Sequence, residues 1–65
     1  MKLKQYYGKK IHIVDIDGVE FSGYVSDYIY AEDNESGNES IIIDTSDGRA
    51  VEFEKADIKE IKIVE

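Results

Sequence analysis

The residues best placed to do chemistry lie in segment 11–19, where an apolar run leads into Asp15, Asp17 and Gly18. A carboxylate can act as a nucleophile toward phosphorus, and a second one beside Mg²⁺ can act as general acid and base, so Asp15 and Asp17 are candidates for phosphoryl transfer. Phosphatases in which such a pair follows an apolar strand are built on a parallel α/β sheet, and this chain has no room for a crossover helix between strands. We therefore interpret Asp17-Gly18 as a hairpin turn and Asp15 as a polar residue at a strand end.

A second group of acids has the chemistry to bind a cation. Carboxylates alternate with other residues in segment 31–40, at Asp33, Glu35 and Glu39. A calcium loop of the EF-hand type needs glycine at its sixth position, glutamate at its twelfth and a helix on each side. This chain has Asn38 and Asp44 at those two positions. We expect a polar surface loop, with weak binding of divalent cations left open.

Residue sets for other catalytic or metal chemistry are missing from the sequence. The chain has no cysteine and a single histidine, His12. The sequence places no serine, cysteine or second histidine to form a catalytic set with it, so we expect His12 on a strand surface. The sequence therefore predicts a protein that is not an enzyme, with no catalytic residue, no metal site and no cofactor.

Tyrosines are the residues most suited to binding. Tyr24, Tyr28 and Tyr30 alternate along one expected strand, on the face opposite the core, with Tyr6 and Tyr7 close by. Exposed tyrosines favour interfaces, because each offers a large amphipathic area at low entropic cost. The alternative is that they pack under the N-terminal helix or the acidic loop, since small domains use every aromatic residue. We predict a binding surface at Tyr24, Tyr28 and Tyr30 for a protein partner.

Charge limits the classes of partner. Eight basic and fifteen acidic residues give a formal net charge of −7, which repels phosphate backbones and anionic membranes. RNA is therefore possible but disfavoured. A local basic cluster lies near the N-terminus, and we interpret it as solubilising charge on a short helix. Its members are Lys2, Lys4, Lys9 and Lys10.

The 65 residues predict one domain, 1–65, with a small core. Without cysteine no disulfide supports that core, so self-association is expected to add stability. The longest apolar run, Ile41–Ile43, is too short to cross a bilayer, and the N-terminal segment lacks the apolar stretch of a secretory signal. We expect a cytoplasmic protein with no membrane partner.

Asp17-Gly18 and Asp47-Gly48 each separate short runs of β-branched and aromatic residues. Glycine after aspartate supplies the positive φ of tight hairpin turns, so each pair predicts two antiparallel strands. A helical turn is expected in residues 2–7, ending at Gly8, and a single turn at 55–57. The expected strands are 10–16, 19–30, 41–45, 49–54 and 58–64.

Two irregularities are predicted within these strands. The apolar pattern changes phase between Ile13 and Val14, which indicates a bulge or a strand covered on both faces. Gly23 interrupts the apolar face of the second strand, where an isolated glycine indicates a bend or a close approach of two backbones. The elements together predict an all-β fold, a small five-stranded SH3-like barrel with a short N-terminal helical turn.

Three stretches carry a resemblance to a known family. Gly8–Ile11, Asp17–Val25 and Ile58–Ile61 resemble the Sm-like (LSm) domain, in which a strand, a turn ending in glycine, an apolar residue, a glycine and another apolar residue follow one another. The resemblance implies the SH3-like barrel. It also implies rings that form through the fourth and fifth strands, and RNA binding by an aspartate and an asparagine in a loop and by an Arg-Gly pair.

The RNA signature of that family is not matched. Its aspartate falls at Ile29 and its asparagine at Asp33, or at Ala31 if the pattern starts at Asp27, and Glu54-Lys55 holds the place of Arg-Gly. We therefore expect an interaction module that binds a protein partner or itself, with an Sm-like RNA-binding protein as the alternative.

Overall fold

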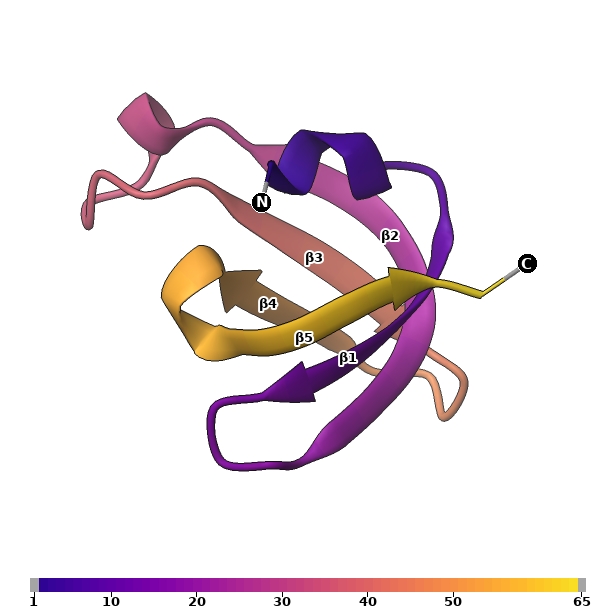
Figure 1. The fold of residues 1–65 in the computed structure, drawn as a ribbon. Helices are drawn as coiled ribbons and strands as arrows, with labels where there is room; N and C mark the ends of the chain where they lie inside the picture. Colours follow the sequence, from indigo (N-terminus) through magenta and orange to yellow (C-terminus); the bar gives the residue numbers. More distant parts are fainter. Residues whose placement is uncertain (1, 65) are drawn as a thin grey trace.

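The structure is a computed structural model that describes residues 2–64. Its five strands form one antiparallel sheet in the order β4-β3-β2-β1-β5, which confirms the all-β class (Figure 1). The predicted helical turns at the N-terminus and before the last strand are short 3₁₀ helices. The elements are η1 (Leu3–Tyr6), β1 (Lys10–Asp15), β2 (Glu20–Ile29), η2 (Ala31–Asp33), β3 (Ser40–Thr45), β4 (Ala50–Glu54), η3 (Lys55–Asp57) and β5 (Ile58–Ile63).

Both predicted Asp-Gly hairpin turns form, each with glycine at positive φ, 81° at Gly18 and 87° at Gly48. The first residue of the β1–β2 turn is Asp15, whose Oδ1 accepts hydrogen bonds from the amides of Asp17 and Val19, at 2.9 and 2.8 Å. Asp15 is therefore more than a polar residue at a strand end: it holds the turn closed, and this use explains the aspartate spacing without phosphoryl chemistry.

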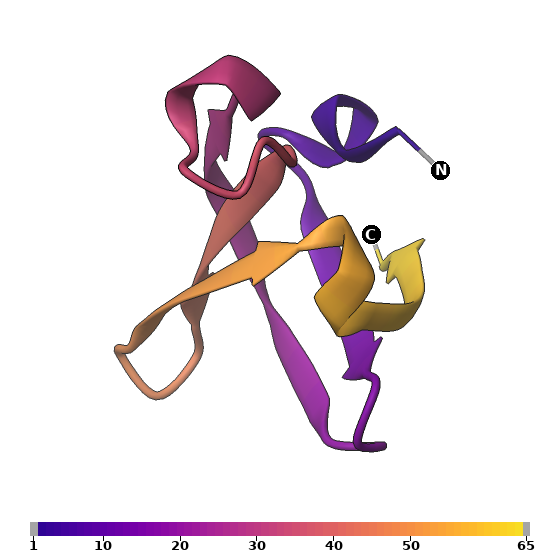
Figure 2. The same ribbon diagram turned by 90° about the vertical axis from the view of Figure 1, so that its left-hand side faces the viewer.

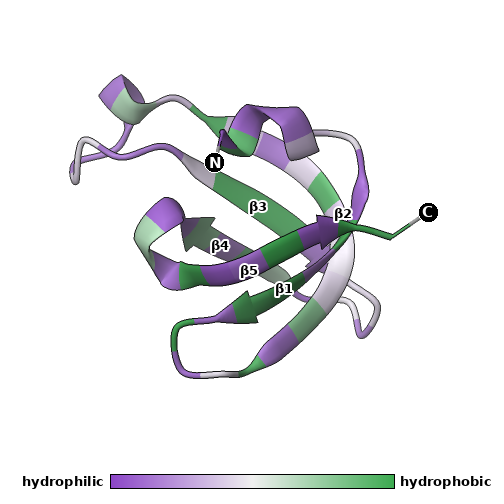
Figure 3. Cartoon of the chain, viewed as in Figure 1, coloured by the Kyte–Doolittle hydropathy of each residue, from purple (hydrophilic) through white to green (hydrophobic). Residues whose placement is uncertain are grey.

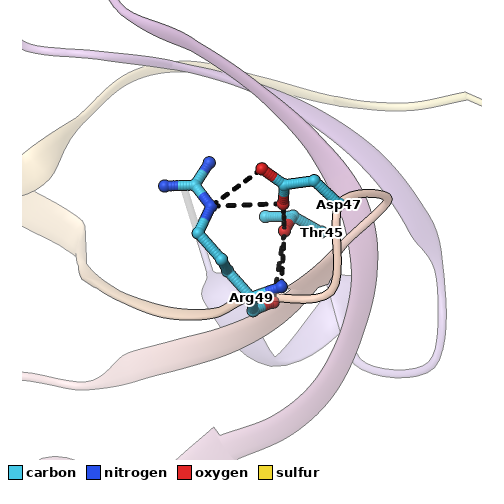
Figure 4. A network of polar contacts seen from close by, with 3 residues as sticks. All are labelled: Thr45, Asp47 and Arg49. Carbon is cyan, nitrogen blue, oxygen red and sulfur yellow. Dashed lines mark hydrogen bonds and ion pairs between the residues drawn. The ribbon is translucent and has the colours of Figure 1, made fainter.

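The β3–β4 turn is held by a polar network of three side chains (Figure 4). Thr45 Oγ1 donates a hydrogen bond to Asp47 Oδ1, and Arg49 Nε donates to both carboxylate oxygens of Asp47, at 3.1 and 3.0 Å. The Thr45 hydroxyl and then the Arg49 side chain lower the pKa of the Asp47 carboxyl below its ordinary value.

A lowered pKa makes this network a source of acid sensitivity. Because Asp47 holds its proton less tightly in the folded state, it stabilises the fold at neutral pH, and this contribution disappears as the pH falls through the lowered pKa. We expect the Asp47→Asn variant to be less stable than the wild type at pH 7. Between pH 7 and strong acid, we expect its free energy of unfolding to fall by less than that of the wild type. Urea unfolding at several pH values measures this. Equal acid sensitivity of the two proteins would contradict it.

β2 is the strand on which the sheet bends. Its first half, residues 20–24, pairs with β1, and its second half, residues 23–29, pairs with β3, so the two pairings overlap only at Gly23 and Tyr24. Figure 1 shows the resulting curve of β2 along one side of the molecule, and Figure 2 shows the same long strand turned by 90°. A β-carbon on Gly23 would lie 2.4 Å from the carbonyl oxygen of Asp44 on β3. The predicted close approach of backbones at Gly23 is thus confirmed.

Two bulges change which side chains share a face. The register of β1 against β5 shifts between Val14 and Asp15, one residue after the predicted change of phase. On β2, Val25 pairs with Ile43 and Asp27 pairs with Ile42, so Ser26 is an extra residue. Because an extra residue exchanges the two faces of a strand beyond it, Tyr28 lies toward the core and Asp27 is exposed.

The core lies on the concave side of the bent sheet. Phe53 packs edge to face on Phe21, with ring centroids 5.0 Å apart, and Leu3 of η1 closes one end. Figure 3 shows the long hydrophobic stretch on β3 and the alternation along β5. The buried hydrophobic residues are Leu3, Ile11, Ile13, Val25, Ile41, Ile43, Phe53 and Ile58.

Strand pairing does not close this sheet. In residues 2–64, β4 pairs only with β3 and β5 only with β1, so both strands leave one edge unpaired. The same part of the chain contains no helix long and apolar enough to cross a membrane.

Candidate functional site

The structure brings together two of the three tyrosines predicted to bind. Tyr28 and Tyr30 lie edge to face, with ring centroids 5.1 Å apart and planes at 85°. With Lys4, Tyr7 and Asp27 they line a cavity of about 200 Å³ between η1 and the end of β2. We call these five residues the aromatic pocket.

Tyr24 lies elsewhere, so the predicted face of three tyrosines does not form as one surface. Tyr24 is 46% exposed and lines a separate, largely apolar hollow of about 250 Å³ beside Gly23 and Val64. The physical reason is the bulge at Ser26, because Tyr24 precedes it and Tyr28 follows it. A strand without the bulge, as expected from the sequence, would carry Tyr24, Tyr28 and Tyr30 on one face.

Lys4 supplies the cation of the aromatic pocket. Its Nζ donates a hydrogen bond to the Tyr30 hydroxyl at 3.2 Å and lies 5.2 Å from the ring centroid. The ammonium is thus nearer to the hydroxyl than to the ring centre, and the hydrogen bond is the main contact. This hydrogen bond raises the pKa of Lys4, which stays charged at neutral pH.

Glu39 connects the pocket to the acidic loop. Its Oε1 accepts hydrogen bonds from the amide of Leu3 at 2.9 Å and from the Tyr28 hydroxyl at 3.4 Å. Burial, followed by the charge of Glu39, raises the pKa of the Tyr28 phenol. Packing of a tyrosine beside the N-terminal helix and the loop, the alternative weighed from the sequence, therefore holds for Tyr28.

A polar set around His12 was not predicted from the sequence. The β1–β2 register places Ser22 opposite His12, so that Ser22 Oγ lies 2.9 Å from Nδ1 while Glu20 Oε1 lies 2.9 Å from Nε2. Pairing outward from a two-residue turn at Asp17-Gly18 would place Gly23 opposite His12. The observed turn spans residues 16–18 instead, and this shift of one residue brings Ser22 opposite His12. Serine, histidine and carboxylate are also the residue types of hydrolases.

The surroundings of His12 favour a structural role for this set. The side chain of Glu20 is 69% exposed, so water competes for its contact with His12. Ser22 lies within a strand rather than on an exposed turn, and the adjacent Gly23 pairs with strands on both sides. Backbone amides used in the sheet cannot also stabilise an oxyanion. The expected position of His12 on a strand surface is observed.

The acidic loop folds against β4. Asn34 Nδ2 donates to the carbonyl of Asn38 at 2.7 Å and to Ser40 Oγ at 3.0 Å, and Ser36 Oγ donates to Glu54 Oε2 at 2.8 Å. Glu54 and Asp57 also cap η3 reciprocally. Over residues 2–64, no group of three or more histidine, cysteine, aspartate or glutamate side chains is arranged to hold a metal ion.

Comparison of the chain with family models, with curated proteins and with solved structures gives no match.

Proposed function

We propose that this protein is a non-enzymatic Sm-like β-barrel module that associates with copies of itself through its strand edges and binds a protein partner through its tyrosines. The order of elements supports the family assignment, because a short N-terminal helix precedes five strands and the second strand is long and bent at a glycine. The expected cytoplasmic location is part of this proposal.

The observation that carries the proposal is the exposure of Ile63. Ile63 pairs with Ile11, which is fully buried, and residues opposite one another in an antiparallel pair share a face of the sheet. Ile63 is nevertheless 46% exposed, because no strand within residues 2–64 pairs with the outer edge of β5. A strand added to this edge would cover it.

β4 of a second copy has the side chains that such a strand needs. Its inward residues, Val51 and Phe53, are apolar and would extend the face that carries Ile63. On its other face, Glu52 is exposed and opposite in charge to Lys62 of β5. Unpaired edges with matching faces favour pairing between chains. Repeated pairing of β4 with β5 produces a ring or a filament.

The binding surface for a separate protein partner is assigned to the tyrosines. Tyr28 and Tyr30 belong to the aromatic pocket, and Tyr24 lines the apolar hollow. Each offers a ring for packing and a hydroxyl for hydrogen bonding, which is the composition found at protein interfaces.

RNA binding remains the second candidate, because the basic cluster lies beside both hollows. Lys4 lines the aromatic pocket and Lys10 lines the hollow at Tyr24. Titration with labelled single-stranded RNA at low salt separates the candidates. Tight, salt-dependent binding would favour RNA, and absence of saturable binding would remove it.

Light scattering after gel filtration tests the self-association. We expect a wild-type mass of several times 7.4 kDa that persists on dilution, and a monomer for Ile63→Lys, which places a charge in the proposed interface. Ile16→Lys is the matched control, because Ile16 is 62% exposed and lies in the β1–β2 turn, outside the strands β4 and β5. A monomeric wild type, or equal masses of the two variants, would overturn edge-to-edge assembly.

A further inference from the structure

We propose that the aromatic pocket binds the guanidinium group of an arginine side chain on a partner protein. This inference rests on the proposed partner-binding function and names the chemistry of that partner. Three features of the pocket support it: the tyrosine rings, the carboxylate of Asp27 and the position of Lys4.

Tyrosine rings form most of the pocket wall. Tyr28 and Tyr30 meet edge to face at 85°, and Tyr7, from the segment after η1, is 56% exposed. All three tyrosines line the same cavity, so a guest in it would contact aromatic side chains from η1's flank and from the end of β2. A guanidinium is planar and weakly hydrated, and it stacks on aromatic faces more readily than an ammonium does.

Asp27 supplies a negative charge in the same cavity. Its Oδ1 accepts a hydrogen bond from the backbone amide of Tyr28 at 2.8 Å, which holds the carboxylate next to the Tyr28 backbone, and Asp27 lines the same cavity as the rings. Among the described residues the Asp27 carboxylate forms no ion pair, so its second oxygen is available to a guest. Hydrogen bonds between guanidinium and carboxylate are charge-assisted and directional.

The position of Lys4 favours a guanidinium over a second ammonium as the guest of the pocket. The Lys4 ammonium already donates a hydrogen bond to the hydroxyl of Tyr30, so a second ammonium would compete for the same acceptor. A guanidinium instead uses the ring faces and Asp27. Lys4 still repels any cation in the pocket, and it is therefore a built-in competitor of the guest. The net charge of −7 attracts basic partners to the whole chain.

Ring-proton NMR of the full chain tests the proposal, with Nα-acetyl-arginine methylamide as the probe and the matching citrulline derivative as its neutral control. We expect saturable shifts of Tyr28 and Tyr30 with arginine, with a dissociation constant in the millimolar range, and none with citrulline. Shifts that do not saturate in that range, or equal shifts with citrulline, would overturn the proposal.

Variants that change one charge distinguish binding in the pocket from non-specific attraction of arginine by the net charge of the protein. We expect Asp27→Asn to weaken arginine binding about tenfold and Lys4→Met to tighten it about threefold. Asp33→Asn and Lys9→Met change the net charge equally but lie outside the pocket, and they should leave binding within experimental error. If each control matched its pocket counterpart, the attraction would be non-specific. A monomeric protein that binds arginine would refute the assembly and leave this pocket standing.

Discussion

Gly23→Ala is expected to remove about 3 kcal/mol from the free energy of unfolding, which is most of the stability of so small a domain. The new β-carbon would lie 2.4 Å from the carbonyl oxygen of Asp44 and 3.2 Å from the α-carbon of Thr45. Both atoms belong to the backbone of β3, so no side-chain rotation relieves the clash. Since Gly23 pairs with β1 as well, β2 cannot move away from β3 without breaking a second pairing.

Urea denaturation followed by circular dichroism measures this loss. Gly37→Ala is the matched control, because Gly37 has a φ of 75° and no atom within 4 Å of the added carbon. Gly37→Ala should lower the free energy of unfolding by only about 1 kcal/mol, because alanine adopts a positive φ less readily than glycine does. If the two alanine variants were equally stable, the close approach at Gly23 would not carry the effect.

Leu3→Ala is expected to cost about 3 kcal/mol. Leu3 is fully buried and is the only residue of η1 in the buried core of the described chain. Its removal opens a cavity at the end of the sheet and detaches η1, so Lys4 should also leave the hydroxyl of Tyr30. The pocket and the core are thus coupled through one side chain.

Two readouts check this second prediction. Urea unfolding gives the loss of stability, and the ring resonances of Tyr30 report the departure of Lys4. Ile16→Ala removes a comparable apolar side chain that is 62% exposed, so it should change the stability by less than about 0.5 kcal/mol. A stable Leu3→Ala with unchanged Tyr30 resonances would show that η1 is held mainly by the hydrogen bond to Glu39.

The sequence predicted most of the strands because its local signals agree with the tertiary structure. Asp17-Gly18 and Asp47-Gly48 specify turns that fix the pairing of the strands beside them. Gly23 signals a bend because no other residue serves the same purpose inside an apolar face. In each case one residue type has a conformational property that its neighbours lack.

The candidate site was harder to predict, because the residue that determines it carries no signal. Ser26 is small and polar and fits either face of a strand, so nothing in its type indicates a bulge. Tyr28 is amphipathic and is equally acceptable inside or outside. One inserted residue therefore moved Tyr28 and Tyr30 together away from the face of Tyr24 and toward Lys4, and only tertiary packing decides that step.

The pairing of β5 with β1 determines how the chain would respond to a pulling force. Ile11 pairs with Ile63, so the beginning of β1 lies beside the end of β5, and the two strands are antiparallel. Force applied through residues 10 and 63 would act along the hydrogen bonds between these strands, which lie perpendicular to them. The hydrogen bonds would then break one after another, in the unzipping geometry, rather than all at once under shear. Such a molecule yields at low force when it is pulled through these two residues.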